Sequence, residues 1–189
     1  MNTRLGPVLS SRDLPLAELC SARLDGELFP LGEFWCPIDE VEGADSRAIA
    51  AGLLVPPRCI AERLTAAWIY GVAPEPLRQQ FCVDTAARAH VPLSPRVQLR
   101  EVRRAMDETR TISGIRVTTE LRTVIDLARC PTDDTDDLVP LLAALLRHGG
   151  FSDAAPALSG CRRTGLPHKN LALRRLAEAQ ALLAYPRRD

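Results

Sequence analysis

The chain has 189 residues, of which 46% are hydrophobic and 25% are charged, and its formal net charge is zero. This composition is typical of a globular protein and excludes a disordered chain, a collagen-like chain and a coiled coil. The neutral charge argues against a histone-like protein that binds nucleic acid by electrostatics alone. Aromatic residues, at 4%, are too scarce for a large platform on which single-stranded bases stack.

The sequence shows neither a targeting segment nor a metal-binding pattern. The N-terminus lacks the apolar stretch of a signal peptide, and the longest apolar run, residues 138–146, is far shorter than the roughly 20 residues that span a bilayer. We therefore expect a cytoplasmic protein without a membrane partner. The six cysteines contain no C-x-x-C pair, and the three histidines do not lie at ligand spacing from them. No metal site, cofactor or disulfide is expected.

The first predicted element is a short helix over residues 14–24. Asp13 can cap its N-terminus, and Pro15 suits its first turn. Three apolar side chains are predicted to share one buried face of this helix, namely Leu16, Leu19 and Cys20.

Two short strands follow, at residues 27–31 and 34–38, joined at Gly32. A helix followed by a hairpin is the arrangement of the last helix and the wing of a winged helix. We therefore predict a partial winged-helix unit over residues 1–45, whose acidic final segment, residues 39–45, is a linker.

The second domain, residues 46–189, is predicted to begin with two helices. Ser46 can cap a short helix that extends to Ala51. Beyond two prolines, apolar residues recur at helical spacing as far as Gly71, which suits a helix C-terminus. These apolar residues are Ile60, Leu64, Ala67 and Trp68, and we expect the Trp68 side chain to be buried.

Strands and further helices complete the predicted second domain. Strands are expected at residues 81–83, at 97–102 and over 111–117, the last as a bent strand or a hairpin with Gly114 at the turn. The predicted helices cover residues 120–128, capped by Thr119, and then 138–147, preceded by the acidic run 132–137, and 169–184. In the first of these helices, Arg122 and Asp126 can pair at i, i+4. The predicted fold class is therefore mixed α/β (α+β), with a partial winged helix in front and helices at the C-terminus.

Charge is distributed unevenly along the chain. Residues 1–50 contain nine acidic and four basic side chains, whereas residues 96–130 contain eight basic and five acidic ones. Arginine side chains bind phosphate oxygens bidentately, so this second segment could contact DNA, and a solvated surface is the alternative interpretation. The candidate DNA-binding residues here are Arg96, Arg100, Arg103, Arg104 and Arg116, with Arg110 in the same run.

One pair of acidic residues invites comparison with an enzyme. Asp84 directly follows one predicted strand, and Glu101, followed by Val102 and Arg103, lies in the next. Restriction-type nucleases place a carboxylate and a Glu-x-Lys pair in this way to hold magnesium and steady the attacking water. Here arginine occupies the lysine position and cannot readily lose its proton. The commoner interpretation is a pair of edge-strand carboxylates that interact with arginine, and no catalytic residue is predicted.

Two segments of the second domain resemble a known family. Residues 63–72 (RLTAAWIYGV) and 114–129 (GIRVTTELRTVIDLAR) are similar to the AbiEi-type antitoxins of type IV toxin–antitoxin systems, in their actinobacterial form. Residues 13–19 (DLPLAEL) and 24–28 (LDGEL) resemble the winged-helix end of that family, here in a shortened form.

The resemblance implies a non-enzymatic antitoxin and transcriptional regulator in two parts. An N-terminal winged helix would bind operator DNA, and the α/β domain would counter a nucleotidyltransferase-like toxin. The helix over residues 14–24 would then be the recognition helix, with Arg12 and Arg23 contacting DNA. Two alternatives stay open, namely a nuclease-like domain that uses Asp84 and Glu101, and a protein-interaction module that does not bind DNA. The operator, the toxin and the oligomeric state are not specified by the sequence.

Overall fold

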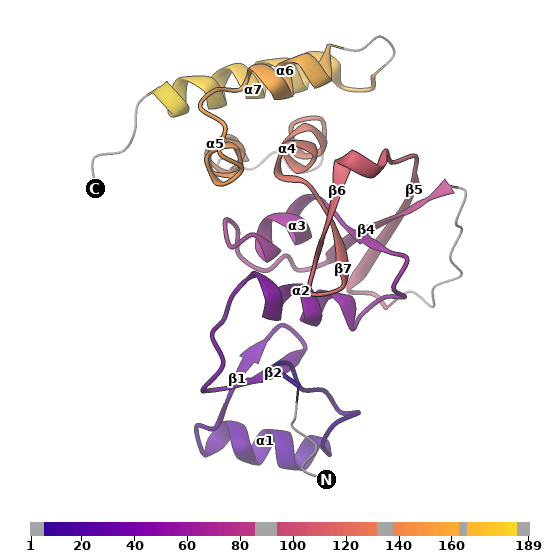
Figure 1. Ribbon diagram of the computed structural model, residues 1–189, viewed down its shortest axis with the longest axis vertical. Helices are drawn as coiled ribbons and strands as arrows, with labels where there is room; N and C mark the ends of the chain where they lie inside the picture. The colour runs from indigo at the N-terminus through magenta and orange to yellow at the C-terminus, as the bar shows by residue number, and fades with distance from the viewer. Residues whose placement is uncertain (1–5, 86–93, 132–137, 163–165, 185–189) are drawn as a thin grey trace.

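A computed structural model describes residues 6–85, 94–131, 138–162 and 166–184. The chain is arranged in three tiers along the long axis of the molecule (Figure 1). A small N-terminal unit forms the first tier, a five-stranded sheet with its flanking helices forms the second, and the C-terminal helices form the third. This arrangement is the mixed α/β architecture that the sequence predicts.

The N-terminal unit consists of helix α1 (Leu16–Leu24) and the antiparallel strands β1 (Leu28–Leu31) and β2 (Phe34–Pro37). The two predicted strands are therefore confirmed. Their tight turn uses Gly32, whose φ of 62° lies in the left-handed region that glycine adopts without strain. A bridge between Leu9 and Trp35 adds the preceding chain segment to the hairpin. A small core of Leu9, Leu19 and Leu28 holds the unit together.

Two details of α1 differ from the prediction. Asp13 does not cap the helix, because its carboxylate accepts hydrogen bonds from the backbone N–H and the hydroxyl of Ser10, each at 2.8 Å. The N-cap is instead Pro15, which has no side-chain group to accept a bond. The predicted apolar face is also wrong, because Leu16 is 58% exposed and Cys20 is exposed, while Leu19 is buried.

Helix α2 (Ala44–Gly52) starts earlier than predicted. Gly43 is its N-cap, and Ser46 lies one turn inside, where its hydroxyl accepts a hydrogen bond from the Gly43 N–H at 3.0 Å. The expected boundary between residues 45 and 46 therefore falls within a helix. The main core also includes Leu31 and Cys36 from the N-terminal unit. The division into two domains stays a prediction.

The central sheet has the strand order β5-β4-β3-β7-β6. The strands are β3 (Ile60–Ala61), β4 (Gln79–Asp84), β5 (Val97–Val102), β6 (Thr109–Ile112) and β7 (Ile115–Thr118). Strand β4 runs parallel to β5, and β3 parallel to β7, while the two remaining pairs are antiparallel. The predicted strands and the hairpin at Gly114, whose φ is 80°, are confirmed.

The long helix predicted before Gly71 is wrong in its first part. Ile60 lies in the central strand β3, where it pairs with Cys82 on one side and Arg116 on the other. The helix, α3 (Arg63–Ile69), begins only after this strand. Its C-terminal half is as predicted, because Trp68 is buried in the main core and Gly71 adopts a φ of 77° after the last turn.

Four helices complete the fold, namely α4 (Glu120–Ala128), α5 (Leu138–His148), α6 (Ala155–Cys161) and α7 (Lys169–Ala184). Thr119 caps α4 as predicted, accepting a hydrogen bond from the Arg122 N–H at 3.3 Å. Helix α6 is not among the helices that the sequence predicts. The acidic run 132–137 lies outside the described residues. Helix α7 lies across α5 in the third tier (Figure 1). Among the described residues, no helix is both long and apolar enough to cross a membrane.

Candidate functional site

A cluster of buried charges lies between the sheet and α4. Its carboxylates are Glu62, immediately after β3, and Asp126 on α4, and its arginines come from β5, the following loop and α4. We call this set, Glu62, Arg100, Arg104, Arg122 and Asp126, the arginine–carboxylate cluster. Three separate elements contribute to it, because Glu62 follows β3, Arg100 lies in β5 with Arg104 just beyond, and Arg122 and Asp126 lie on α4.

Arg104 is the central member of the cluster. One of its terminal nitrogens lies 2.6 Å from Glu62 Oε2 and 2.6 Å from Asp126 Oδ2, so a single guanidinium donates to both carboxylates. Arg100 donates to both oxygens of Glu62, at 2.6 and 2.8 Å. The side chains of Glu62, Arg104 and Asp126 are only 1%, 3% and 6% exposed. At such depth, charges are tolerated only when they are paired, as they are here.

Asp126 also accepts hydrogen bonds from Arg122, one helical turn earlier on α4. Burial alone would raise the pKa of the Asp126 carboxyl, but Arg122 and Arg104 outweigh that effect and hold the pKa below its ordinary value. The i, i+4 pairing of Arg122 with Asp126 that the sequence predicts is confirmed. Asp126 is therefore ionised, and it links α4 to the loop that follows β5.

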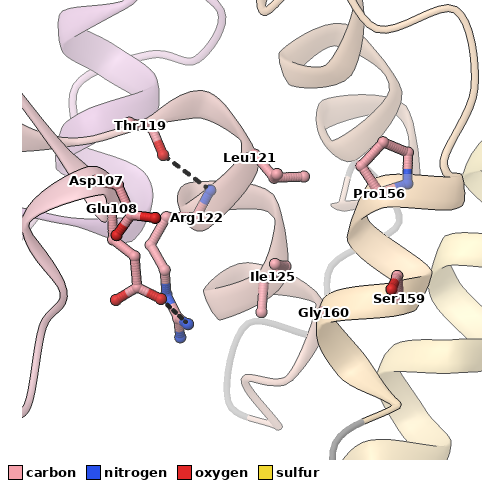
Figure 2. A pocket seen from close by; sticks show the side chains of 9 residues that line it. All are labelled: Asp107, Glu108, Thr119, Leu121, Arg122, Ile125, Pro156, Ser159 and Gly160. Atoms are coloured by element: carbon pink, nitrogen blue, oxygen red, sulfur yellow. Dashed lines mark hydrogen bonds and ion pairs between the residues drawn. The ribbon is translucent and has the colours of Figure 1, made fainter.

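A pocket of about 320 Å³ opens beside Arg122 (Figure 2). It lies between the loop at residues 106–108, α4 and α6, and is lined by Asp107, Glu108, Thr119, Leu121, Arg122, Ile125, Pro156, Ser159 and Gly160. Figure 2 shows the ion pair of Arg122 with Glu108, 3.2 Å long, at its wall. Gly160 permits the close approach of α6, since a Cβ there would lie 2.6 Å from Ile125 Cδ1.

The structure separates the candidate DNA-binding arginines. Arg12, Arg23 and Arg103 are exposed. Arg96 is also exposed and forms an ion pair of 3.0 Å with Glu33 of the N-terminal hairpin. Half-buried Arg116 donates to Thr109 Oγ1 at 3.3 Å.

The remaining two candidates belong to the arginine–carboxylate cluster. Arg104 lies inside the protein and is unable to contact DNA from that position, because Glu62 and Asp126 hold it there. Arg100 is about one-third exposed, and Glu62 accepts two of its hydrogen bonds. The predicted basic face is therefore not one continuous surface.

The two carboxylates of the nuclease alternative do not converge. Strands β4 and β5 pair in parallel with Val83 opposite Glu101 and Asp84 opposite Val102. Opposed residues share a face of a sheet and successive residues alternate, so Asp84 and Glu101 point to opposite faces. Among the described residues, no group of three or more His, Cys, Asp or Glu side chains could hold a metal ion.

Sequence reasoning identified part of the cluster and missed the rest. The local spacing in α4 indicated Arg122 and Asp126, whereas Glu62 was not singled out at all. Its partner Arg104 is 42 residues away along the chain, so only the paired sheet brings them together. The residue types gave one weak signal, since Glu62 is an acidic residue that directly follows the apolar run of residues 59–61.

These features define a mixed α/β protein built around a buried ion-pair cluster. Residues 50–158 match the family model of the AbiEi antitoxin C-terminal domain, and the chain belongs to this family of antitoxins. The whole arginine–carboxylate cluster lies in the matched segment. The crystal structure of the RV2827C protein from Mycobacterium tuberculosis is similar over 95% of this chain and 76% of that chain, with a TM-score of 0.47 and 16% identity. No curated protein matches the chain in sequence.

Proposed function

We propose that this protein is an antitoxin that counters a nucleotidyltransferase-like toxin and regulates its own gene by binding operator DNA. The observation that supports the antitoxin half most strongly is the family match over residues 50–158. This segment comprises the whole sheet with its flanking helices α3, α4 and α5. The buried cluster ties β3, β5 and α4 of this segment together, which provides a rigid frame for presenting a surface to a protein partner.

The DNA-binding half rests on the exposed arginines of the N-terminal unit. Arg12 and Arg23 are the only basic residues between positions 5 and 46, and both are exposed. Arg23 lies in the last turn of α1, while Glu18 and Asp25 lie close by in sequence and repel phosphate. We therefore infer that contacts with DNA are few and that binding is weak at physiological salt.

Replacing Arg12 and Arg23 together with alanine should reduce sequence preference more than total affinity for DNA. The slope of log affinity against log salt should fall by about 0.9 for each phosphate contact that is lost. The measurement is a salt series with the DNA upstream of the gene and with a scrambled sequence. Arg174→Ala, which removes an exposed arginine of α7, is the matched control and should leave both slopes unchanged.

If the double variant and the wild type have the same sequence preference and the same slope of log affinity against log salt, the N-terminal unit does not read DNA. Together with intact neutralisation of the toxin, that outcome would support the protein-interaction module as the correct alternative.

A further inference from the structure

A second pocket, of about 240 Å³, has Asp126 of the arginine–carboxylate cluster in its lining. Its walls come from the start of α3, the end of α4 and the segment that leads into α7. It is lined by Arg63, Arg100, Asp126, Arg129, Pro131, Pro167 and His168. Three of these residues are arginines and one is a carboxylate, so the lining is strongly positive.

The carboxylates nearby already pair with arginines of the arginine–carboxylate cluster, which includes Arg100 of the pocket wall. Glu62 accepts from Arg100 and Arg104, and Asp126 accepts from Arg104 and Arg122. Within the described part of the chain, neither Arg63 nor Arg129 has a carboxylate partner. Two guanidinium groups in the pocket wall are therefore not neutralised by any carboxylate of the described residues.

Arg63 lacks a hydrogen bond that its burial calls for, and Arg129 is held in place by one. The Nε of Arg63 is buried, and among the described residues it has no hydrogen-bond partner. The Nε of Arg129 donates to the Pro167 carbonyl at 3.1 Å, which fixes the guanidinium at the pocket wall. Burial, together with the nearby charge of Arg122, lowers the pKa of Arg129. Leaving a buried donor unsatisfied is costly, so an acceptor that reaches the Arg63 side chain would relieve that cost. The Nε of Arg104, inside the arginine–carboxylate cluster, is the other buried donor without a partner among the described residues.

The backbone of the pocket is strained at two places. Among the described residues, the non-glycine positions with positive φ are Arg63 at 51°, Ser113 at 45° and His168 at 55°. Ser113 belongs to the β6–β7 turn, whereas both of the others line this pocket. Side chains in the left-handed region cost conformational energy, and residues of this kind concentrate at ligand sites.

We propose that this pocket binds a phosphate group, with Arg63 and Arg129 as its principal ligands and Arg100 as a third. Guanidinium groups match the oxygens of phosphate in geometry and charge, and their hydrogen bonds are strengthened by that charge. The volume is below the 300–1,000 Å³ typical of drug-sized ligands, which suits a phosphate group rather than a whole cofactor. The phosphate could belong to a free nucleotide or to the end of a nucleic-acid strand, since both offer the same chemistry.

The test is a titration of the full chain at constant ionic strength, in which binding is measured by calorimetry and by the shifts of amide signals in NMR spectra. Inorganic phosphate is the first probe and chloride is its control. ATP and an oligonucleotide with or without a 5′ phosphate form the further arms, which distinguish the two sources. We expect saturable binding of phosphate, with amide shifts at residues 63, 129 and 168, and no such shifts with chloride.

Arg63→Gln and Arg129→Gln should each weaken phosphate binding by about tenfold or more, as expected for the loss of a hydrogen bond to a charged group. Arg174→Gln, on the exposed face of α7, should bind like the wild type. Arg63→Gly is the second variant, because glycine tolerates the positive φ. It should keep or raise the melting temperature and still lose phosphate affinity, which separates binding from folding. Absence of saturable phosphate binding in the wild type, or unchanged affinity in folded Arg63→Gly and Arg129→Gln, would overturn the proposal.

Discussion

Replacing Asp126 with asparagine should lower the free energy of unfolding by about 3–5 kcal/mol, the cost of removing one partner from a buried ion pair. The substitution removes the Asp126 carboxylate from both Arg104 and Arg122. Among the described residues, Arg104, whose side chain is 3% exposed, then keeps only Glu62 as a carboxylate partner. The measurement is urea denaturation followed by circular dichroism. Glu108→Gln is the matched control, because the Glu108–Arg122 pair is more exposed and should contribute about 1 kcal/mol or less.

The acid stability of the same variant provides a second readout. The pKa of Asp126 is lower in the folded protein than its ordinary value of 3.8, so its ionised form stabilises the fold. This contribution is complete above that value and is lost as the pH falls towards the folded pKa. As the pH falls from 5 to below the folded pKa of Asp126, the free energy of unfolding of Asp126→Asn should therefore decrease less steeply than that of the wild type. An unchanged urea midpoint in Asp126→Asn would show that the cluster does not stabilise the fold.

Trp68→Ala should also cost about 3–5 kcal/mol, through the loss of a large buried ring and the cavity that it leaves. Trp68 is 5% exposed and lies in α3 among the residues of the main core. Helix α3 packs on β4, α2 and α4, so the cavity would lie where several elements meet. Thermal unfolding is the measurement. If the wild type has the stability of an ordinary domain, the Trp68→Ala variant should be close to unfolding at 37 °C.

Leu77→Ala is the control for this substitution. Leu77 is 97% exposed, so its truncation should change stability by no more than about 0.5 kcal/mol. Equal melting temperatures for Trp68→Ala and the wild type would exclude α3 from the core.

Elements with a local cause could be predicted from the sequence. The hairpin at Gly114 follows from a residue type that adopts positive φ, and α4 follows from a threonine cap and an apolar face of period 3.6. The pairing of Arg122 with Asp126 is local for the same reason, since one helical turn brings the two side chains together.

Features that depend on tertiary pairing were predicted wrongly or missed. Ile60 stands four residues before Leu64, as in a helix, but the partner strands on both sides stabilise it in β3. Arg104 belongs to a run of arginines that is typical of a protein surface. It is buried because it pairs with Glu62 and Asp126, which lie far from it in the sequence. Helix α6 is short and contains Gly160, a poor helix former, although Pro156 suits its first turn. It forms because it packs on α4 and α7.

The proposed function predicts a nucleotidyltransferase-like reading frame adjacent to this gene. Growth of a host in which that reading frame is induced is the most direct test of the antitoxin assignment. Co-production of the wild-type chain should restore growth. The Arg12→Ala/Arg23→Ala double variant should restore it equally, because we assign neutralisation to the domain matched by the family model. The Trp68→Ala variant should restore growth less than the wild type, in proportion to the fraction of the chain that is no longer folded. Failure of the wild-type chain to restore growth, although it accumulates in folded form, would contradict the proposed function.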